Sequence, residues 1–285
     1  MKSSRSLLFA VASLLTTALS IPLSASSDTD AVAGRALVKR YADSVVGIEL
    51  VVTLKMKMGD REAPPREQRI EVNGTVISSS GLTVTSLAEV DPQTAFEAMR
   101  ANAPAGRAPE LVGVEFKEVK LRLADGKEVP ARFVLKDGDL DLAFMAPEVS
   151  GDAPKPEFPS YVKLDESTEG AVMGTYFCVE RAPKALQRVP LVRTSSIAGV
   201  VEKPRRFYLM TAYALGAPML DQSGRVLGIT VQNFSGGRRT GLMVLPAADI
   251  ADIAKQAATL QMQPKAPEAP KATEVPAPTA PETKP

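Results

Sequence analysis

Short apolar or alternating runs, each ended by Gly, Pro, Asp or Asn, dominate the middle of the chain. Runs of this length and spacing are typical of β-strands. We predict strands over Ser44–Leu54, Arg69–Ile77, Leu82–Ser86, Val119–Leu123, Glu128–Leu135, Asp141–Met145, Gly170–Glu180, Arg188–Val201, Phe207–Met210, Val226–Val231 and Thr240–Pro246. Asp125 and Gly126 predict a tight hairpin turn between two of them.

Two segments repeat their apolar residues with helical spacing: Ala33–Tyr41 before the first strand, and Ala247–Ala258 at the end. Many short strands separated by turn signals are typical of an all-β barrel or sandwich. Two such sets within residues 32–260 predict an all-β fold of two antiparallel barrels with a C-terminal helix. Residues 93–109 combine a helix-like patch with a Pro/Gly/Ala-rich loop, and we interpret them as an insertion.

The two ends of the chain differ from the middle. Residues 1–25 begin with Lys2 and Arg5, continue with an apolar run and finish with small residues, which is the pattern of a signal peptide. That apolar run is too short for a membrane-spanning helix, so no transmembrane span is expected. Residues 264–285 are rich in Pro and Ala and predict a disordered tail, which is either a tether to envelope material or an inert spacer.

Composition removes several classes of function. The chain has no His, no Trp and one Cys, so it can form neither a His-dependent nucleophilic relay nor a Cys or His metal centre. We therefore expect no metal and no cofactor. Its 34 basic and 33 acidic residues give a net charge of +1, which offers no electrostatic reason to bind nucleic acid.

Three segments together resemble HtrA/Deg-type trypsin-like serine proteases. Residues 74–90 read GTVISSSGLTVTSLAEV, the stretch in which that family carries its histidine. Residues 121–129 (LRLADGKEV) and 137–144 (DGDLDLAF) resemble its hairpin and aspartate segment, and residues 215–230 (LGAPMLDQSGRVLGIT) resemble its nucleophile loop. Each motif is weak alone, but their order and spacing agree across nearly the whole folded region.

The resemblance implies two six-stranded-type antiparallel barrels with a cleft between them. It places the family's histidine on Ala88 and its nucleophilic serine on Leu215, while the aspartate is matched by Asp141. The glycine that helps to form the family's oxyanion hole falls on Tyr213, so that function is also expected to be lost. The chain after Leu260 is too short and too proline-rich for the PDZ module that usually follows in this family.

The altered site allows two interpretations. Ala88 and Leu215 either fill the space left by the catalytic side chains or line an apolar groove for a peptide. Asp141 is expected to have a structural role. The family's substrate-pairing edge corresponds to the strand near residues 229–232, so the predicted binding residues are Leu215, Gly216, Ile229, Thr230 and Val231.

Two further residues could carry chemistry. Cys178 lies among apolar neighbours and is expected to be a buried hydrophobe. Ser195 or Ser196 with a lysine would be the remaining route to catalysis, but nothing in the sequence places such a pair in the cleft.

These features predict an exported, proteolytically inactive trypsin-like homologue, periplasmic or secreted and possibly envelope-associated, that binds a protein or an extended peptide. Two alternatives stay open. One is a structural protein of the cell envelope that is tethered by its Pro-rich tail, and the other is a serine endopeptidase with non-standard catalytic residues. The sequence does not predict the oligomeric state.

Overall fold

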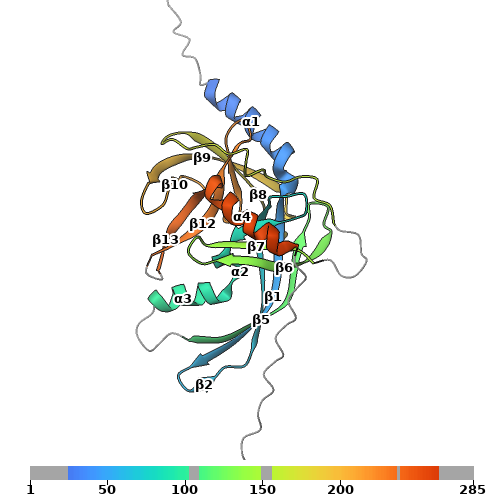
Figure 1. Cartoon of the computed structure of the whole chain (residues 1–285), viewed down its shortest axis with the longest axis vertical. Coiled ribbons are helices and arrows are strands. Elements are labelled where there is room, and N and C mark those ends of the chain that lie inside the picture. The colour runs from blue at the N-terminus through green and yellow to red at the C-terminus, as the bar shows by residue number, and fades with distance from the viewer. Residues whose placement is uncertain (1–24, 103–108, 149–155, 236–237, 263–285) are drawn as a thin grey trace, which may run out of the picture.

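Two closed rings of antiparallel strands form the centre of the molecule (Figure 1). The computed structural model describes residues 25–102, 109–148, 156–235 and 238–262. The predicted tail and the predicted signal peptide, apart from Ala25, lie outside these residues. The all-β fold class and the two barrels predicted from the sequence are confirmed.

The first barrel closes because its two outermost strands pair with each other. Its strands, in spatial order, are β1 (Val45–Met58), β3 (Arg66–Val76), β4 (Thr83–Ser86), β7 (Leu142–Pro147), β6 (Glu128–Asp137) and β5 (Glu110–Arg122). β5 returns to pair with β1 over most of its length. The short strand β2 (Arg61–Glu62) pairs with the last two residues of β1. At the predicted hairpin between β5 and β6, Gly126 adopts φ +85° and its N–H donates to Leu123 O over 3.0 Å.

The second barrel contains six strands. In spatial order they are β10 (Phe207–Met210), β13 (Arg238–Pro246), β12 (Val226–Ser235), β11 (Pro218–Leu220), β8 (Thr175–Arg181) and β9 (Pro190–Val201), and β9 closes the ring on β10.

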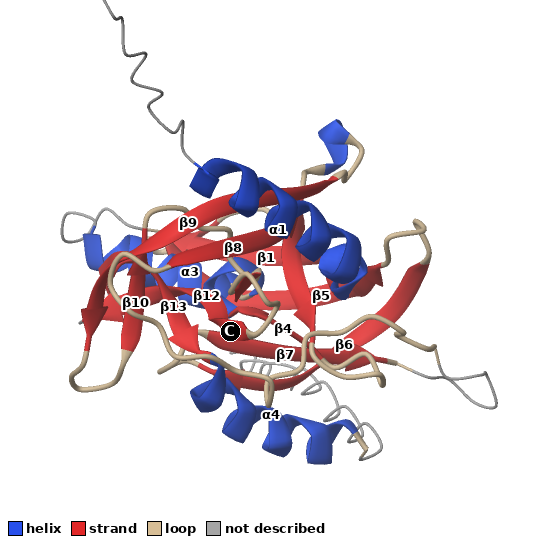
Figure 2. Cartoon of the chain, turned by 90° about the horizontal axis from the view of Figure 1, so that it is seen from above, coloured by secondary structure: helices blue, strands red, loops and turns tan. Residues whose placement is uncertain are grey.

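Helices lie outside the barrels (Figure 2). They are α1 (Ala25–Tyr41), α2 (Leu87–Val90), α3 (Pro92–Asn102) and α4 (Ala247–Gln261), with the 3-10 turns η1 (Ala42–Ser44) and η2 (Lys184–Leu186). α1 packs on β8 and β9, and α4 contacts strands of both barrels from the other side of the molecule (Figure 2). α3 forms the helical part of the predicted insertion and contacts β5 and β13. No helix in the described part of the chain is both long enough and apolar enough to span a membrane.

The apolar core has three parts. One cluster fills the first barrel and another fills the second. The third contains Phe144 of the first barrel and Ile229 of the second, together with Leu37 of α1 and Ile250 of α4, all buried. This shared cluster joins the two barrels and their helices, so it fixes the relative position of the segments that meet between them.

Several element boundaries differ from the predictions, and the short strands β2 and β11 were not predicted. β8 begins at Thr175 rather than Gly170, because residues 171–174 form a turn in which Gly174 N–H donates to Ala171 O over 2.9 Å. β1, β3 and β5 are also longer than predicted, since they extend beyond the barrel at its β2 end (Figure 1). Half of their extra residues are charged, which lowers the apolar content that signals a strand.

Candidate functional site

Asp141 lies in the turn between β6 and β7, where that turn meets the second barrel. Its backbone is left-handed, with φ +56°, and its carbonyl accepts a hydrogen bond from Leu87 N–H over 2.9 Å. The Asp137 carboxylate shapes the same turn by accepting the N–H groups of Asp139 and Leu140, each over 3.0 Å. Asp tolerates the left-handed region better than most residues, so the turn can direct this side chain inward.

The Asp141 carboxylate is 3% exposed and accepts three hydrogen bonds. Ala88 N–H donates to Oδ1 over 2.7 Å, Gln232 N–H of the second barrel donates to Oδ2 over 2.7 Å, and the Ser86 hydroxyl also donates to Oδ2. Burial raises the pKa of this carboxyl from 3.8 to about 6, although the three donors act in the opposite direction. Asp141 therefore connects both barrels through hydrogen bonds.

Ala88 lies next to this carboxylate in α2. The residue is 6% exposed. Its N–H donates to Asp141, the acid that the resemblance matches to the family's catalytic aspartate. Because the chain contains no histidine, no imidazole can accept a proton here or anywhere else in the molecule.

Gly216 follows Leu215 in the nucleophile-equivalent loop, which is the start of the segment 215–230 that resembles the family's nucleophile loop. Through this glycine the loop contacts both barrels. The Gly216 N–H donates to Thr230 O over 3.0 Å, and its carbonyl accepts the Thr75 hydroxyl of β3 over 2.7 Å. Its φ is +70°, and a Cβ at this position would lie 2.2 Å from Asn73 O. Only glycine fits this approach without displacing backbone. Leu215 itself is half-buried.

Tyr213 and its neighbours form a well-connected loop. The Tyr213 hydroxyl accepts Met210 N–H over 2.8 Å, and its ring packs against the core of the second barrel. Ser195 holds the same loop, because its hydroxyl lies 3.0 Å from both the N–H and the carbonyl of Ala212. These contacts give the Ser195 hydroxyl a structural role.

The strand β12 does not present a free edge at Ile229 and Thr230. On one side Ile229 pairs with Leu245 of β13, and on the other it pairs with Pro218 of β11. Thr230 continues this pairing, since its N–H donates to Ala217 O over 3.2 Å and its carbonyl accepts Gly216 N–H. The side chains of Ile229, Thr230 and Val231 are buried, whereas the sequence suggested an accessible edge. The short connection formed by residues 214–217 thus continues the backbone hydrogen bonding along β12. The order of apolar and polar residues in the sequence does not show such a contact.

Cys178 is fully buried in the second barrel, as predicted. Burial raises the pKa of its thiol to about 12. The thiol is therefore protonated at neutral pH and is a poor nucleophile.

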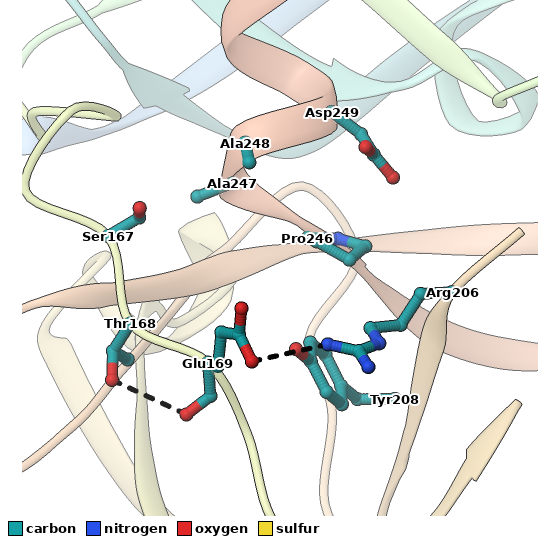
Figure 3. Close-up of a pocket in the computed structure, with 9 residues that line it drawn as sticks. All are labelled: Ser167, Thr168, Glu169, Arg206, Tyr208, Pro246, Ala247, Ala248 and Asp249. Carbon is teal, nitrogen blue, oxygen red and sulfur yellow. Dashed lines mark hydrogen bonds and ion pairs between the residues drawn. The ribbon is translucent and has the colours of Figure 1, made fainter. Parts of the chain in front are cut away.

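Cavities occur elsewhere on the described surface. One of about 280 Å³ lies at the first turn of α4 and includes Arg206, Tyr208 and Asp249 (Figure 3). Arg206 is paired there with Glu169 at 3.3 Å. Cavities of about 270 Å³ beneath α4 and about 110 Å³ between the barrels are likewise lined by residues other than Ala88, Asp141 and Leu215. Within the described ranges, no three Asp, Glu or Cys side chains gather to hold a metal.

The family model of the trypsin-like peptidase domain matches residues 72–229, which is more than half of the chain. The chain belongs to the trypsin-like peptidase family. A search of curated proteins found no match. Among solved structures, the apo MamO protease domain from Magnetospirillum magneticum is 16% identical, covers 75% of this chain and 97% of its own, and gives a TM-score of 0.46.

Within this trypsin-like peptidase domain, the structure adds residues that the sequence did not single out. Ser86 and Gln232 hold Asp141, Thr75 binds the Gly216 carbonyl, and Asn73 O approaches Gly216 too closely for a side chain. The sequence offered one indication for Ser86, because this residue lies two positions before Ala88 and therefore near the predicted site. Gln232 lies in the predicted edge 229–232, but its contact with Asp141 had no signal, because the backbone N–H rather than the side chain makes it.

Proposed function

We propose that this protein is an exported trypsin-like peptidase homologue that does not cleave peptide bonds and acts by binding protein or extended peptide. The observation that carries the proposal is the surroundings of Asp141. Its carboxylate accepts a backbone N–H from Ala88 and a hydroxyl from Ser86, in a chain without histidine. A serine-peptidase mechanism needs a base that takes the nucleophile's proton, and Ala88 has no such group.

The nucleophile-equivalent loop supports the same proposal. Leu215 carries no hydroxyl, and Tyr213 occupies the position that the resemblance assigns to an oxyanion-hole glycine. The Tyr213 hydroxyl binds Met210 N–H, which holds the loop in its present shape. Three separate requirements of proteolysis are therefore unmet at one site.

The binding part of the proposal concerns Leu215 above all. Ile229, Thr230 and Val231 are buried, so they support the site from beneath, whereas Leu215 is half-buried and can contact a ligand. Gly216 fixes the backbone next to Leu215 against β3. An apolar side chain on a rigid backbone between two barrels suits an apolar residue of an extended segment.

Export is proposed from residues 1–25, whose charged start, apolar run and small residues form a signal-peptide pattern. We accordingly place the mature chain in the periplasm or outside the cell. Mass spectrometry of the mature N-terminus, isolated from a cell fractionation, tests this. An uncleaved N-terminus in the cytoplasmic fraction would contradict it.

Proteolysis is tested with the purified mature protein, casein and a fluorogenic peptide library. We expect no turnover and no labelling by a fluorophosphonate, because Leu215 has no hydroxyl and the chain has no imidazole to activate another one. The matched variant Ala88→His/Leu215→Ser/Tyr213→Gly restores the three missing groups, and it shows whether those losses account for the inactivity. Cleavage by the unmodified protein would overturn the proposal.

Binding is tested by selecting peptides from a displayed library on the immobilised mature chain and measuring their affinity. Leu215→Glu is expected to weaken binding at least tenfold, because it places a charge where an apolar contact is proposed. Leu186→Glu is the control, since Leu186 is 62% exposed at the end of η2, outside the site. Equal loss in both variants, or no selection of peptides at all, would argue against a binding function here.

A further inference from the structure

The long strands of the first barrel form an open arm. β4 pairs with β3 only at Thr75 and Val76, and β6 pairs with β5 only over residues 120–122. Beyond those points β1 continues between β3 and β5 as a three-stranded sheet outside the ring, at the end of the molecule where β2 lies (Figure 1).

The outer side of β3 has no strand partner from Arg66 to Val72 among the described residues. Such an edge exposes a row of backbone N–H and C=O groups and is a template for another strand. Pro64 and Pro65 precede it, and proline cannot donate to a ladder. Near Asn73 the edge is covered, because the Thr85 hydroxyl binds Asn73 O over 2.8 Å. The open edge is therefore a short segment with defined ends.

Two charged residues of this segment, Glu67 and Arg69, have no ion-pair partner among the described residues. Glu67 and Arg69 point to the same side of the sheet, because they lie opposite Thr53 and Val51 of β1. Both are exposed, and neither forms a salt bridge with the described residues. Glu71, by contrast, is already paired with Arg188 at 2.7 Å.

We propose that the β3 edge, residues 66–70, pairs antiparallel with the same edge of a second copy of this chain. A two-fold axis perpendicular to the sheet requires one residue of β3 to lie opposite itself. With Gln68 opposite Gln68, Glu67 of each copy lies opposite Arg69 of the other, and the two ion pairs flank the axis. The ladder ends where Ile70 meets Arg66, because the next position would be Pro65.

Neighbouring registers fit less well. Centring the axis on Arg69 or on Glu67 places two like charges directly opposite each other, which destabilises a strand pair. Centring it on Ile70 places Arg69 opposite Glu71, whose carboxylate is already paired with Arg188 at 2.7 Å, and places Glu67 opposite Asn73, whose carbonyl is occupied. The charge order and the covered end together select Gln68. The resulting assembly is one continuous sheet, β5–β1–β3 of one copy followed by β3–β1–β5 of the next.

Sedimentation velocity of the purified mature chain over a range of concentrations tests the dimer. We expect a monomer–dimer equilibrium for the unmodified protein. Glu67→Arg and Arg69→Glu should each weaken it by about tenfold or more, since each variant turns both ion pairs into repulsions. The double swap Glu67→Arg/Arg69→Glu recreates both pairs with opposite polarity and should restore the dimer.

Glu115→Arg provides the control. Glu115 is exposed, lies opposite Thr53 on the same side of the sheet as Glu67, and belongs to β5 rather than to the proposed interface. It should leave association unchanged, and circular dichroism should show that every variant is folded. A protein that is monomeric at all concentrations, a control that weakens association as much as Glu67→Arg, or a double swap that fails to restore it would overturn the proposal.

Discussion

At the scale of single residues, Asp141 is a buried acid where the two barrels meet, in a chain without histidine. Three donors hold its carboxylate, and one of them, Gln232 N–H, belongs to the other barrel. The dominant influence on its pKa is nevertheless burial, which raises it to about 6. The site thus contains an acid that titrates near neutral pH, with the Ser86 hydroxyl but no imidazole beside it.

The raised pKa predicts a pH dependence of stability. The folded state binds the Asp141 proton more tightly than the unfolded state does, whose pKa is near 3.8. This contribution to folding is complete below pH 4 and is lost as the pH rises through 6, amounting to about 3 kcal/mol. Asp141→Asn removes this titration. The difference between the unfolding free energies of the two proteins in urea should therefore change between pH 4 and 6.5, and parallel pH profiles would contradict the raised pKa.

Gly216 predicts a second residue-scale effect. In Gly216→Ala the new methyl group would lie 2.2 Å from Asn73 O and 2.4 Å from Thr85 Oγ1, at a φ of +70°. We expect a loss of about 3 kcal/mol in unfolding free energy, because backbone has to move. Gly126→Ala is the matched control, since Gly126 has a similar φ and open space around it. That change should cost only about 1 kcal/mol of strain. Similar losses in both variants would show that the close approach at Gly216 is unimportant.

At the scale of elements, β8 is connected to the start of β1 by one side chain. The Arg181 guanidinium is 8% exposed and donates to Val45 O over 2.6 Å and to Ala42 O over 2.7 Å. These carbonyls lie in η1 and at the first residue of β1, where α1 leads into the first barrel. Arg181 therefore joins the entry to the first barrel to the end of a strand in the second.

Arg181→Lys keeps the charge but cannot reach both carbonyls, because an ammonium group lacks the planar fork of a guanidinium. We expect a loss of about 2 kcal/mol in the free energy of unfolding, measured by urea denaturation. Arg206→Lys should change it little, since Arg206 is 41% exposed and its carboxylate partners are on the surface. An Arg181→Lys protein as stable as the unmodified one would show that these two hydrogen bonds do not stabilise the fold.

At the scale of the whole molecule, the shared apolar cluster couples the barrels. It contains Leu142 and Phe144 of the first barrel and Phe177 and Leu220 of the second, all at most 1% exposed. Loss of packing in one barrel therefore removes contacts from the other. We expect a single cooperative unfolding transition for the described core.

Cys178 reports this coupling, because its thiol is fully buried in the second barrel. Labelling by a thiol reagent at pH 8 should be slow in the native protein and immediate in guanidinium chloride. Leu142→Ala, a change in the first barrel, should accelerate native labelling at least tenfold, since it destabilises the shared core. The exposed Val172→Ala should not accelerate it. An unchanged rate in Leu142→Ala would mean that the second barrel opens independently.

The sequence by itself determined the two barrels, the terminal helix and the family. The signals for these features are local: strand-length apolar runs, the Asp125–Gly126 turn and three motifs in fixed order. They can be recognised without knowing which distant residues are in contact. The resemblance also assigned Ala88 and Asp141 to the same site, and in the structure these two residues are in contact.

Only the tertiary structure decided what surrounds those positions. The hydrogen bond from Gln232 to Asp141 spans 91 residues, and the one from Thr75 to Gly216 spans 141. The pairing that covers Ile229 and Thr230, and the open edge of β3, likewise depend on which strands meet and in which register. The alternating pattern of one strand shows which face it buries, but the register also depends on the partner strand, which lies far away in the chain.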